Sequence, residues 1–564
     1  MTEMSEMTLS SIICKNESMI QFDKDIIPSE FINWEGIDVA TLNMQNAKFG
    51  VVNLKINKKD PIIQKRHFVF TVDCSGSMSD ICNDSRSKMD HSNHTLINMI
   101  TYFAEHPELL VSVTVFAFDG SIYNIIINQK VTEQNLDEVV KSVKKIRPKD
   151  LTNIEKALLN SKEYIATYIE NNAETHVCHI FMTDGDATDG ATIPSKLKEY
   201  VNPLIPNVFI GFGIEHNAYL LKELASDNKN SYYFVDELEK AGLVYGEILH
   251  SIIYRVLETT KISLVNGLIY DWKKNIWVDK IYIGDLISES NKIFHVLSNN
   301  PSEFECTFQT THCITKEIYD FTIQNLHEYK KVDTIEDGFV ILTQYKYRQR
   351  TQQLLFEVNE YNFDKVKNDE TWGFNRSNDT HIDTEDSFNS IKLKEKMKSL
   401  LKEMQEFLDN TTVIADSSFI KLLCDDLYIC LKTFDTKHSA MFSCARQLSQ
   451  GAQRAYSATR TPKAPINRHV FDIENYGTPI FERTNAGNYN DNGSLISKFP
   501  DFNIDELNDD NFNKEFYQII NDSDNDNNND NDNDIEYNLS SADDNPYSTL
   551  SISDLMRSCS KNSK

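Results

Sequence analysis

A chain of 564 residues is too long for one hydrophobic core, so we expect two or three domains with polar additions. Its net charge of −28 argues against nucleic acid as the main partner, because phosphate binding requires a basic surface. Its apolar runs are far shorter than a membrane span, and its first residues lack the apolar core of a secretion signal. We therefore expect neither a transmembrane segment nor a signal peptide.

Residues 1–62 are expected to form an N-terminal lead-in that ends in a strand at 49–56. From 63 to 258, strands alternate with amphipathic helices, which predicts an α/β fold with a doubly wound, Rossmann-like sheet. The pair Asp119-Gly120 predicts a hairpin, and therefore one antiparallel edge strand. The expected strands are 68–73, 110–118, 121–127, 176–183, 208–213 and 232–235, and the last helix is expected at 238–257.

The composition changes after this unit. Short alternating segments over 259–358, at 280–284, 303–308 and 338–342, predict a small antiparallel β-sandwich. After a polar break at 359–386, apolar stripes with helical spacing predict a helical hairpin or bundle over 388–457.

The end of this helical segment and the tail are polar. The last helical turns are interpreted as a solvated helix end or, alternatively, as a docking surface for self-assembly; their polar and aromatic residues are Arg446, Gln447, Gln453, Arg454 and Tyr456. From 461 to 564, the Asn/Asp-rich composition predicts a mostly disordered acidic tail, since it offers little apolar surface to bury.

The ten cysteines are spread along the chain without a C-x-x-C pair, which argues against a zinc knuckle or a disulfide framework. Cys74, Cys178, Cys424 and Cys430 lie in apolar runs and are expected to be buried thiols. This usage favours a reducing compartment, so we expect a cytoplasmic or otherwise intracellular protein, or one inside a particle.

Oxygen-bearing side chains follow the first and fourth strands of the expected sheet. Asp73, Ser75 and Ser77 lie on the loop that leaves the first strand, Asp184 follows the fourth, and Thr152 lies on the long loop between them. In a sheet of order 3-2-1-4-5-6, these two strands are neighbours where the order reverses, so their exit loops face one crevice. Carboxylates and hydroxyls suit a hard cation such as Mg²⁺.

These five residues resemble the metal-ion-dependent adhesion site of von Willebrand factor A domains, and they match that family's motif at every position. The resemblance implies that Asp73, Ser75, Ser77, Thr152 and Asp184 hold Mg²⁺ or Mn²⁺, with the carboxylates acting largely through bridging waters. It also implies an open coordination position for a Glu or Asp of a partner protein.

The sequence departs from the family's pattern at one place, and a second resemblance concerns the region after the A-type domain. Residues 150–151 are Asp and Leu where many relatives carry Gly-Gly before the threonine. The composition and the region after the A-type domain are similar to uncharacterised intracellular A-domain proteins of protists and fungi, and the Asn, Ile, Asp and Lys bias resembles proteins of large DNA viruses.

Two other functions remain open. A metal-dependent phosphohydrolase or phosphotransferase would use Asp73 as its nucleophile, but the second carboxylate that such enzymes need is replaced by Ser75, which cannot act as the general acid or base. No Gly-rich phosphate loop or G-x-S-x-G elbow is present either, so we expect no enzyme. The second alternative is an assembly scaffold with a vestigial metal site.

Overall fold

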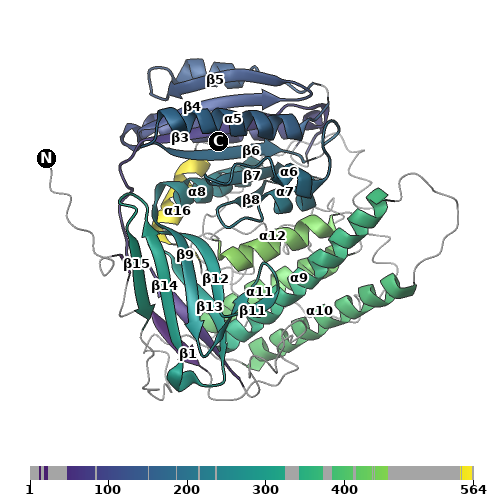
Figure 1. Cartoon of the computed structure of the whole chain (residues 1–564). Helices are drawn as coiled ribbons and strands as arrows, with labels where there is room; N and C mark the ends of the chain where they lie inside the picture. Colours follow the sequence, from purple (N-terminus) through teal and green to yellow (C-terminus); the bar gives the residue numbers. More distant parts are fainter. Residues whose placement is uncertain are drawn as a thin grey trace, which may run out of the picture.

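The computed structural model describes residues 12–13, 18–22, 47–82, 85–149, 151–185, 187–213, 216–235, 238–323, 342–371, 384–410, 414–434, 436, 438–454, 547 and 549–561. Figure 1 shows three packed parts, namely a six-stranded sheet with helices, a pair of antiparallel sheets, and a group of long helices. We call them the six-stranded unit, the sandwich and the helical unit.

The six-stranded unit has the strand order β5-β4-β3-β6-β7-β8, and only the pairing of β5 with β4 is antiparallel. This is the 3-2-1-4-5-6 order of a doubly wound sheet, so the predicted fold class is confirmed. The hairpin at Asp119-Gly120 joins β4 to β5, as predicted. The strands are β3 (Arg66–Asp73), β4 (Val111–Phe118), β5 (Ile122–Lys130), β6 (His176–Thr183), β7 (Asn207–Phe212) and β8 (Ser231–Val235).

The central strand β3 is buried on both faces, because its side chains alternate between two layers of helices. Phe68 and Val72 pack on one side, and Val69 packs on the other. Helices α3 (Lys88–Glu105), α4 (Leu136–Val143) and α8 (Leu238–Ile253) cover the first face, and α5 (Ile154–Asn171), α6 (Pro194–Lys198) and α7 (Ala218–Leu224) cover the second. The last helix ends earlier than predicted, since Arg255 already begins β9.

The sandwich includes the N-terminal strands, which the sequence analysis assigned to a separate lead-in. Strand β2 pairs along its whole length with β13, about 240 residues later. One sheet contains β1 (Met19–Phe22), β2 (Lys48–Lys55), β13 (Asn291–Ser298), β10 (Leu268–Asp271) and β11 (Ile276–Val278). The other contains β12 (Lys280–Ile287), β9 (Arg255–Val265), β14 (Glu305–His312) and β15 (Ile318–Ile323). The six-stranded unit is therefore inserted between two strands of the sandwich.

The helical unit packs on the outer face of the five-stranded sheet, where Phe49 and Val51 of β2 contact the helices. It consists of α9 (Leu342–Thr371), α10 (Thr384–Asn410), α11 (Ile414–Thr433) and α12 (Ser439–Ala452). The predicted β structure to residue 358 is wrong, because α9 occupies that stretch and part of the expected polar break. Of the expected strand at 338–342, only Leu342 is described, and it begins α9.

The polar residues at the end of α12 are neither a solvated end nor an exposed docking surface, so that interpretation is wrong. Arg446 and Gln447 are buried, and Arg446 lies 3.6 Å from Asp426 of α11. Gln453 accepts a hydrogen bond from the main-chain N–H of Ile293 and so joins α12 to β13. Arg454 donates to the carbonyl of Tyr232, and Tyr456 lies outside the described residues.

The expected disordered tail lies outside the described residues up to 546. Its end differs from the prediction, because α16 (Leu550–Lys561) is a helix that packs beside α8 (Figure 1). Every helix in the described part of the chain is too short or too polar to cross a bilayer. All nine described cysteines are free thiols, and Cys74, Cys178, Cys424 and Cys430 are buried as predicted.

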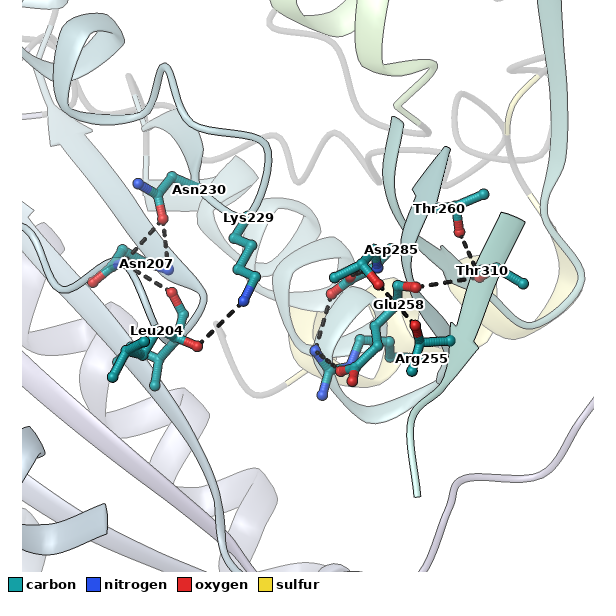
Figure 2. A network of polar contacts seen from close by, with 12 residues as sticks. Leu204, Asn207, Lys229, Asn230, Arg255, Glu258, Thr260, Asp285 and Thr310 are labelled. Atoms are coloured by element: carbon teal, nitrogen blue, oxygen red, sulfur yellow. Dashed lines mark hydrogen bonds and ion pairs between the residues drawn. The ribbon is translucent and has the colours of Figure 1, made fainter. Parts of the chain in front are cut away.

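Two buried arginines hold the boundary between the six-stranded unit and the sandwich. The Nη2 of Arg66 donates to the carbonyl of Ile62, where the chain enters the unit, and to that of Ile253, where it leaves. Figure 2 shows Arg255 at the start of β9, with its Nη1 3.0 Å from Asp285 of β12 and 3.5 Å from Glu258. Entry and exit are thus held together by one guanidinium, and the exit strand is anchored to the sandwich by another.

The buried histidines predict a loss of stability in mild acid. Burial lowers the pKa of eight histidines, so the folded chain keeps them neutral while the unfolded chain protonates them below about pH 6.5. The free energy of unfolding should then fall as the pH decreases, by up to about 1.4 kcal/mol per pH unit for each histidine. The residues are His67, His94, His176, His179, His216, His250, His295 and His312.

Two buried acids act in the opposite direction. Burial raises the pKa of Asp73 to about 7 and that of Asp426 to about 6, which adds stability as the pH falls. Eight groups outweigh two, so urea unfolding in a chelator between about pH 7 and pH 5 should show a net loss. A free energy of unfolding that stays constant over this range would contradict the prediction.

Candidate metal centre

The sheet brings the two candidate carboxylates to the same edge. Strand β3 pairs in parallel with both β4 and β6, and its register places Val72 opposite Met182. Asp73 and Thr183 are the next residues of the two strands, and Asp184 follows directly. The strand order reverses between β3 and β6, and a reversal of this kind sends the loops after the two strands in opposite directions.

Asp73 is fully buried at the end of β3, and both of its carboxylate oxygens accept hydrogen bonds. Oδ1 accepts from the main-chain N–H of Ser75 at 2.8 Å, and Oδ2 accepts from the hydroxyl of Thr183 at 2.5 Å. Burial and the nearby Asp184 raise the pKa of Asp73 to about 7, against the hydrogen bonds from Thr183 and Ser75. Because the carboxylates of Asp73 and Asp184 repel each other, both can be ionised together only when positive charge lies nearby.

The two serines turn their hydroxyls toward each other. A short helical turn, η2 (Gly76–Ser79), follows Ser75, and the oxygens of Ser75 and Ser77 lie 3.2 Å apart. Ser75 stands at the N-cap of this turn, but its side chain does not cap it. Ser79, in contrast, donates to the carbonyl of Gly76. The hydroxyls of Ser75 and Ser77 therefore lie close to each other, whereas the hydroxyl of Ser79 closes the turn.

Thr152 is buried on a loop that is fastened to both strand exits. The N–H of Lys149 donates to the carbonyl of Cys74, which lies between Asp73 and Ser75. The N–H of Thr152 donates to the hydroxyl of Thr188, and its carbonyl accepts from the N–H groups of Thr188 and Asp189. These contacts bring Thr152 beside the loops of Asp73 and Asp184. Asp150 lies outside the described residues.

A lysine that the sequence analysis missed neutralises part of this site. The Nζ of Lys88, at the start of α3, lies 3.1 Å from Oδ2 of Asp184 and 3.1 Å from Oδ2 of Asp80. Burial alone would lower the pKa of Lys88, but the two carboxylates outweigh it and raise that pKa. The other oxygen of Asp184, Oδ1, is buried and has no hydrogen-bond partner in the part of the chain that the structure describes.

The donor set fits a hard divalent cation. The unpartnered Oδ1 of Asp184 is a buried anionic oxygen that a cation, or a water bound to a cation, would satisfy. The other proposed donors are the carboxylate of Asp73, whose two oxygens also accept hydrogen bonds, and three neutral hydroxyls. Such oxygen donors suit Mg²⁺ or Mn²⁺ better than a soft metal. No group of three or more His, Cys, Asp or Glu side chains that could hold a metal occurs among the described residues. The proposed site differs from such a group, because it has two carboxylates and three hydroxyls.

Two contributors to this site were not predicted from the sequence, namely Thr183 and Lys88. Thr183 directly precedes Asp184, and its position at the end of β6, beside Asp73, could have been inferred from the parallel register. Lys88 gave no comparable signal, because it is one of many lysines and follows Ser77 by eleven residues.

Residues 68–246 match the family model of the von Willebrand factor type A domain. Inter-alpha-trypsin inhibitor heavy chain H3 of Rattus norvegicus is 26% identical over 226 residues, which are 38% of this chain and 24% of that protein. This chain thus spans about a quarter of the length of the curated relatives that it matches.

Solved structures with related folds are more distant in sequence. A von Willebrand factor type A protein from Catenulispora acidiphila is 11% identical, with a TM-score of 0.40, and the match covers 64% of this chain and 84% of that one. Proximal thread matrix protein 1 from the mussel byssus, with a zinc-occupied MIDAS motif, is 15% identical, with a TM-score of 0.29, over 37% of this chain and 51% of that one.

Removal of the Lys88 charge should destabilise the metal-free protein. In Lys88→Met, the carboxylate of Asp184, which is 3% exposed, loses its only ion pair among the described residues. Breaking a buried pair in this way should cost about 3 kcal/mol of unfolding free energy, measured by urea unfolding in a chelator. The cost should shrink when Mg²⁺ is added, because a bound cation restores positive charge beside Asp184.

Lys156→Met is the matched control, since the Lys156 ammonium is exposed and donates to the carbonyl of Gly120. Equal effects of the two substitutions would show that the Lys88 pair carries no special stabilisation.

Proposed function

We propose, from the premise that this chain carries a von Willebrand factor type A domain, that it binds an acidic side chain of a partner protein through a divalent cation. Domains of this type mediate metal-dependent protein–protein interaction. The observation that carries the proposal is the buried Oδ1 of Asp184, which has no hydrogen-bond partner among the described residues, on a carboxylate close enough to help raise the pKa of Asp73. The paired hydroxyls of Ser75 and Ser77 follow Asp73 on the same loop.

Each residue of the proposed site has a distinct task. Asp73 and Asp184 supply the negative charge, and Ser75, Ser77 and Thr152 supply neutral oxygens that leave the positive field of a cation largely in place. A bound Mg²⁺ or Mn²⁺ would offer a coordination position to an outside Glu or Asp carboxylate. Lys88 lowers the net negative charge further, because its ammonium pairs with Asp184.

The acidic character of the whole chain does not oppose an acidic partner. Charges on exposed surfaces are screened beyond a Debye length of about 8 Å at physiological salt, so the field at the site is set by its immediate neighbours. The net charge of −28 includes the Asn/Asp-rich segment at 521–534, which is remote in sequence from the site.

The geometry disfavours a phosphohydrolase or phosphotransferase. Asp73 would be the nucleophile, but it is fully buried and both of its oxygens accept hydrogen bonds. Burial, with Asp119 and Asp73 nearby, raises the pKa of Cys74 to about 12, so this thiol does not supply a thiolate at neutral pH. The nearby carboxylate, Asp184, is already paired with the Lys88 ammonium.

We place the protein inside the cell. The nine described cysteines are all free, which fits a reducing compartment better than an oxidising one. A scaffold with a vestigial site is the remaining alternative, and the metal dependence of stability distinguishes it from the binding module.

Thermal melting should reveal a cation bound to the folded state. With Mg²⁺ or Mn²⁺ at about 100 times its Kd, the free energy of unfolding should rise by about 2.7 kcal/mol over the value in a chelator. Asp73→Ala, Ser75→Ala and Asp184→Ala should each abolish this gain, because they remove proposed ligands. The same three variants should lose Mg²⁺-dependent capture of a partner that displays an accessible Glu or Asp.

Ser79→Ala is the matched control, because Ser79 lies on the same turn and its hydroxyl donates to the carbonyl of Gly76. A melting temperature that is insensitive to the cation would favour the vestigial scaffold. Phosphatase turnover that depends on Asp73 would overturn the binding proposal.

A further inference from the structure

The C-terminal helix α16 lies in a groove on the six-stranded unit, far along the chain from everything it touches. Its buried residues follow helical spacing at Ile552, Leu555, Met556 and Cys559, which is the i, i+3, i+4, i+7 pattern of one apolar face. Leu555 and Cys559 join the core formed by α3 and α8. Figure 1 shows α16 in yellow beside α8. These apolar residues therefore form the face by which α16 packs on the six-stranded unit, and Ser553 is buried as well.

The floor of the groove is shaped for a closely approaching helix. At Gly246 of α8, a Cβ would lie 2.5 Å from the Cα of Met556 and 2.7 Å from its nitrogen, so any side chain there would collide with the backbone of α16. Glycine costs a helix interior about 1 kcal/mol relative to alanine, and here it permits the contact. Leu243 and Ile287 complete the apolar lining around Ile552 and Met556.

Polar contacts fix the register of α16. The N–H of Ser551 donates to Glu289 Oε2 at 3.1 Å, and the hydroxyl of Ser551 lies 2.7 Å from Nε2 of His250 on α8. The first turn is capped from within, because the N–H of Ile552 donates to the hydroxyl of Thr549. Just before it, the hydroxyl of Tyr547 donates to Gln450 of the helical unit at 3.2 Å. The segment 547–561 therefore joins the helical unit to the six-stranded unit.

The packing of α3 on α8 does not rely on α16 alone. Helices α3 and α8 are joined directly by the buried hydroxyls of Thr95 and Tyr245, which lie 2.6 Å apart. About 90 residues separate Arg454 from Tyr547 along the chain. A helix of twelve residues is marginal in water alone, so α16 depends on the groove for its own helicity.

We infer that this groove, formed by α8, α3 and residues 287–289, is a helix-binding site whose ligand is the chain's own C-terminal helix, held reversibly. Docking and folding of α16 are one event, and its release leaves the six-stranded unit folded. The site does not include the proposed metal ligands, since none of the contacts of α16 given above involves Asp73, Ser75, Ser77, Thr152 or Asp184, although α3 also carries Lys88.

Hydrogen exchange of the full chain tests the inference directly. In Gly246→Ala, the added Cβ should exclude α16, and amides over 550–561 should exchange roughly tenfold faster or more, while those of β3 and β6 keep their protection. Gly120→Ala is the matched glycine control, because the nearest atom to its Cβ would be 4.0 Å away. Leu550→Ala, at a 73% exposed position of α16, should also leave exchange unchanged apart from local effects.

A binding measurement provides the second test. In the full chain with Leu555→Asp and Met556→Asp, the tail should leave the groove, and a labelled peptide of residues 546–564 with the natural sequence should then bind. The unaltered chain should bind the peptide more weakly, because its groove is occupied, and a chain that also carries Gly246→Ala should not bind it.

Either of two results would overturn the inference. The first is loss of amide protection in β3 and β6 when α16 is displaced, which would make the helix an inseparable part of the core. The second is failure of the peptide to bind a folded chain whose own tail has been altered.

Discussion

The parallel pairing of β3 with β6 is the constraint on which the proposed site depends. It joins residues about 110 positions apart and places Asp73 and Thr183 side by side at the carboxyl edge of the sheet. The reversal of strand order at this pairing separates the following loops and leaves room between them. The long loop that carries Thr152 is then fixed by main-chain hydrogen bonds to both exits, from Lys149 to Cys74 and between Thr152 and Thr188.

Gathering two carboxylates at a buried edge creates an electrostatic cost that the chain meets with Lys88. Its ammonium pairs with Oδ2 of Asp184 and leaves Oδ1 unpartnered, so the site is compensated in part only. If protein groups neutralised both carboxylates completely, a cation would gain little by binding. If no protein group neutralised them, the unpaired buried charges would destabilise the metal-free fold. Lys88 neutralises only part of the negative charge, which is compatible with a protein that folds first and binds a cation afterwards.

Features that depend on neighbouring residues could be predicted from the sequence, whereas pairings between distant segments were found only in the structure. The sheet was predicted from strand–helix alternation, and the five proposed ligands were suggested by their resemblance to the A-domain motif, because both signals can be read from short segments of the sequence. The pairing of β2 with β13 could not be read in this way, since a strand at 48–55 carries no mark of a partner 240 residues later. The polar end of α12 was misread for a related reason. Arg446 and Gln447 are buried by partners from other elements, including Asp426, and their residue type alone suggests exposure.

The insertion of the six-stranded unit into the sandwich determines where a partner can approach. Both connections lie at the edge where β3 begins, and Arg66 ties them together through the carbonyls of Ile62 and Ile253. The proposed metal site lies at the other end of the same strand, at Asp73, seven residues after Arg66, which is about 23 Å at the usual rise of a strand. The sandwich therefore anchors the unit from one edge and leaves the loops of the opposite edge free of those connections. A binding module requires this separation, because its ligand-bearing loops must face outward while its termini join the rest of the chain.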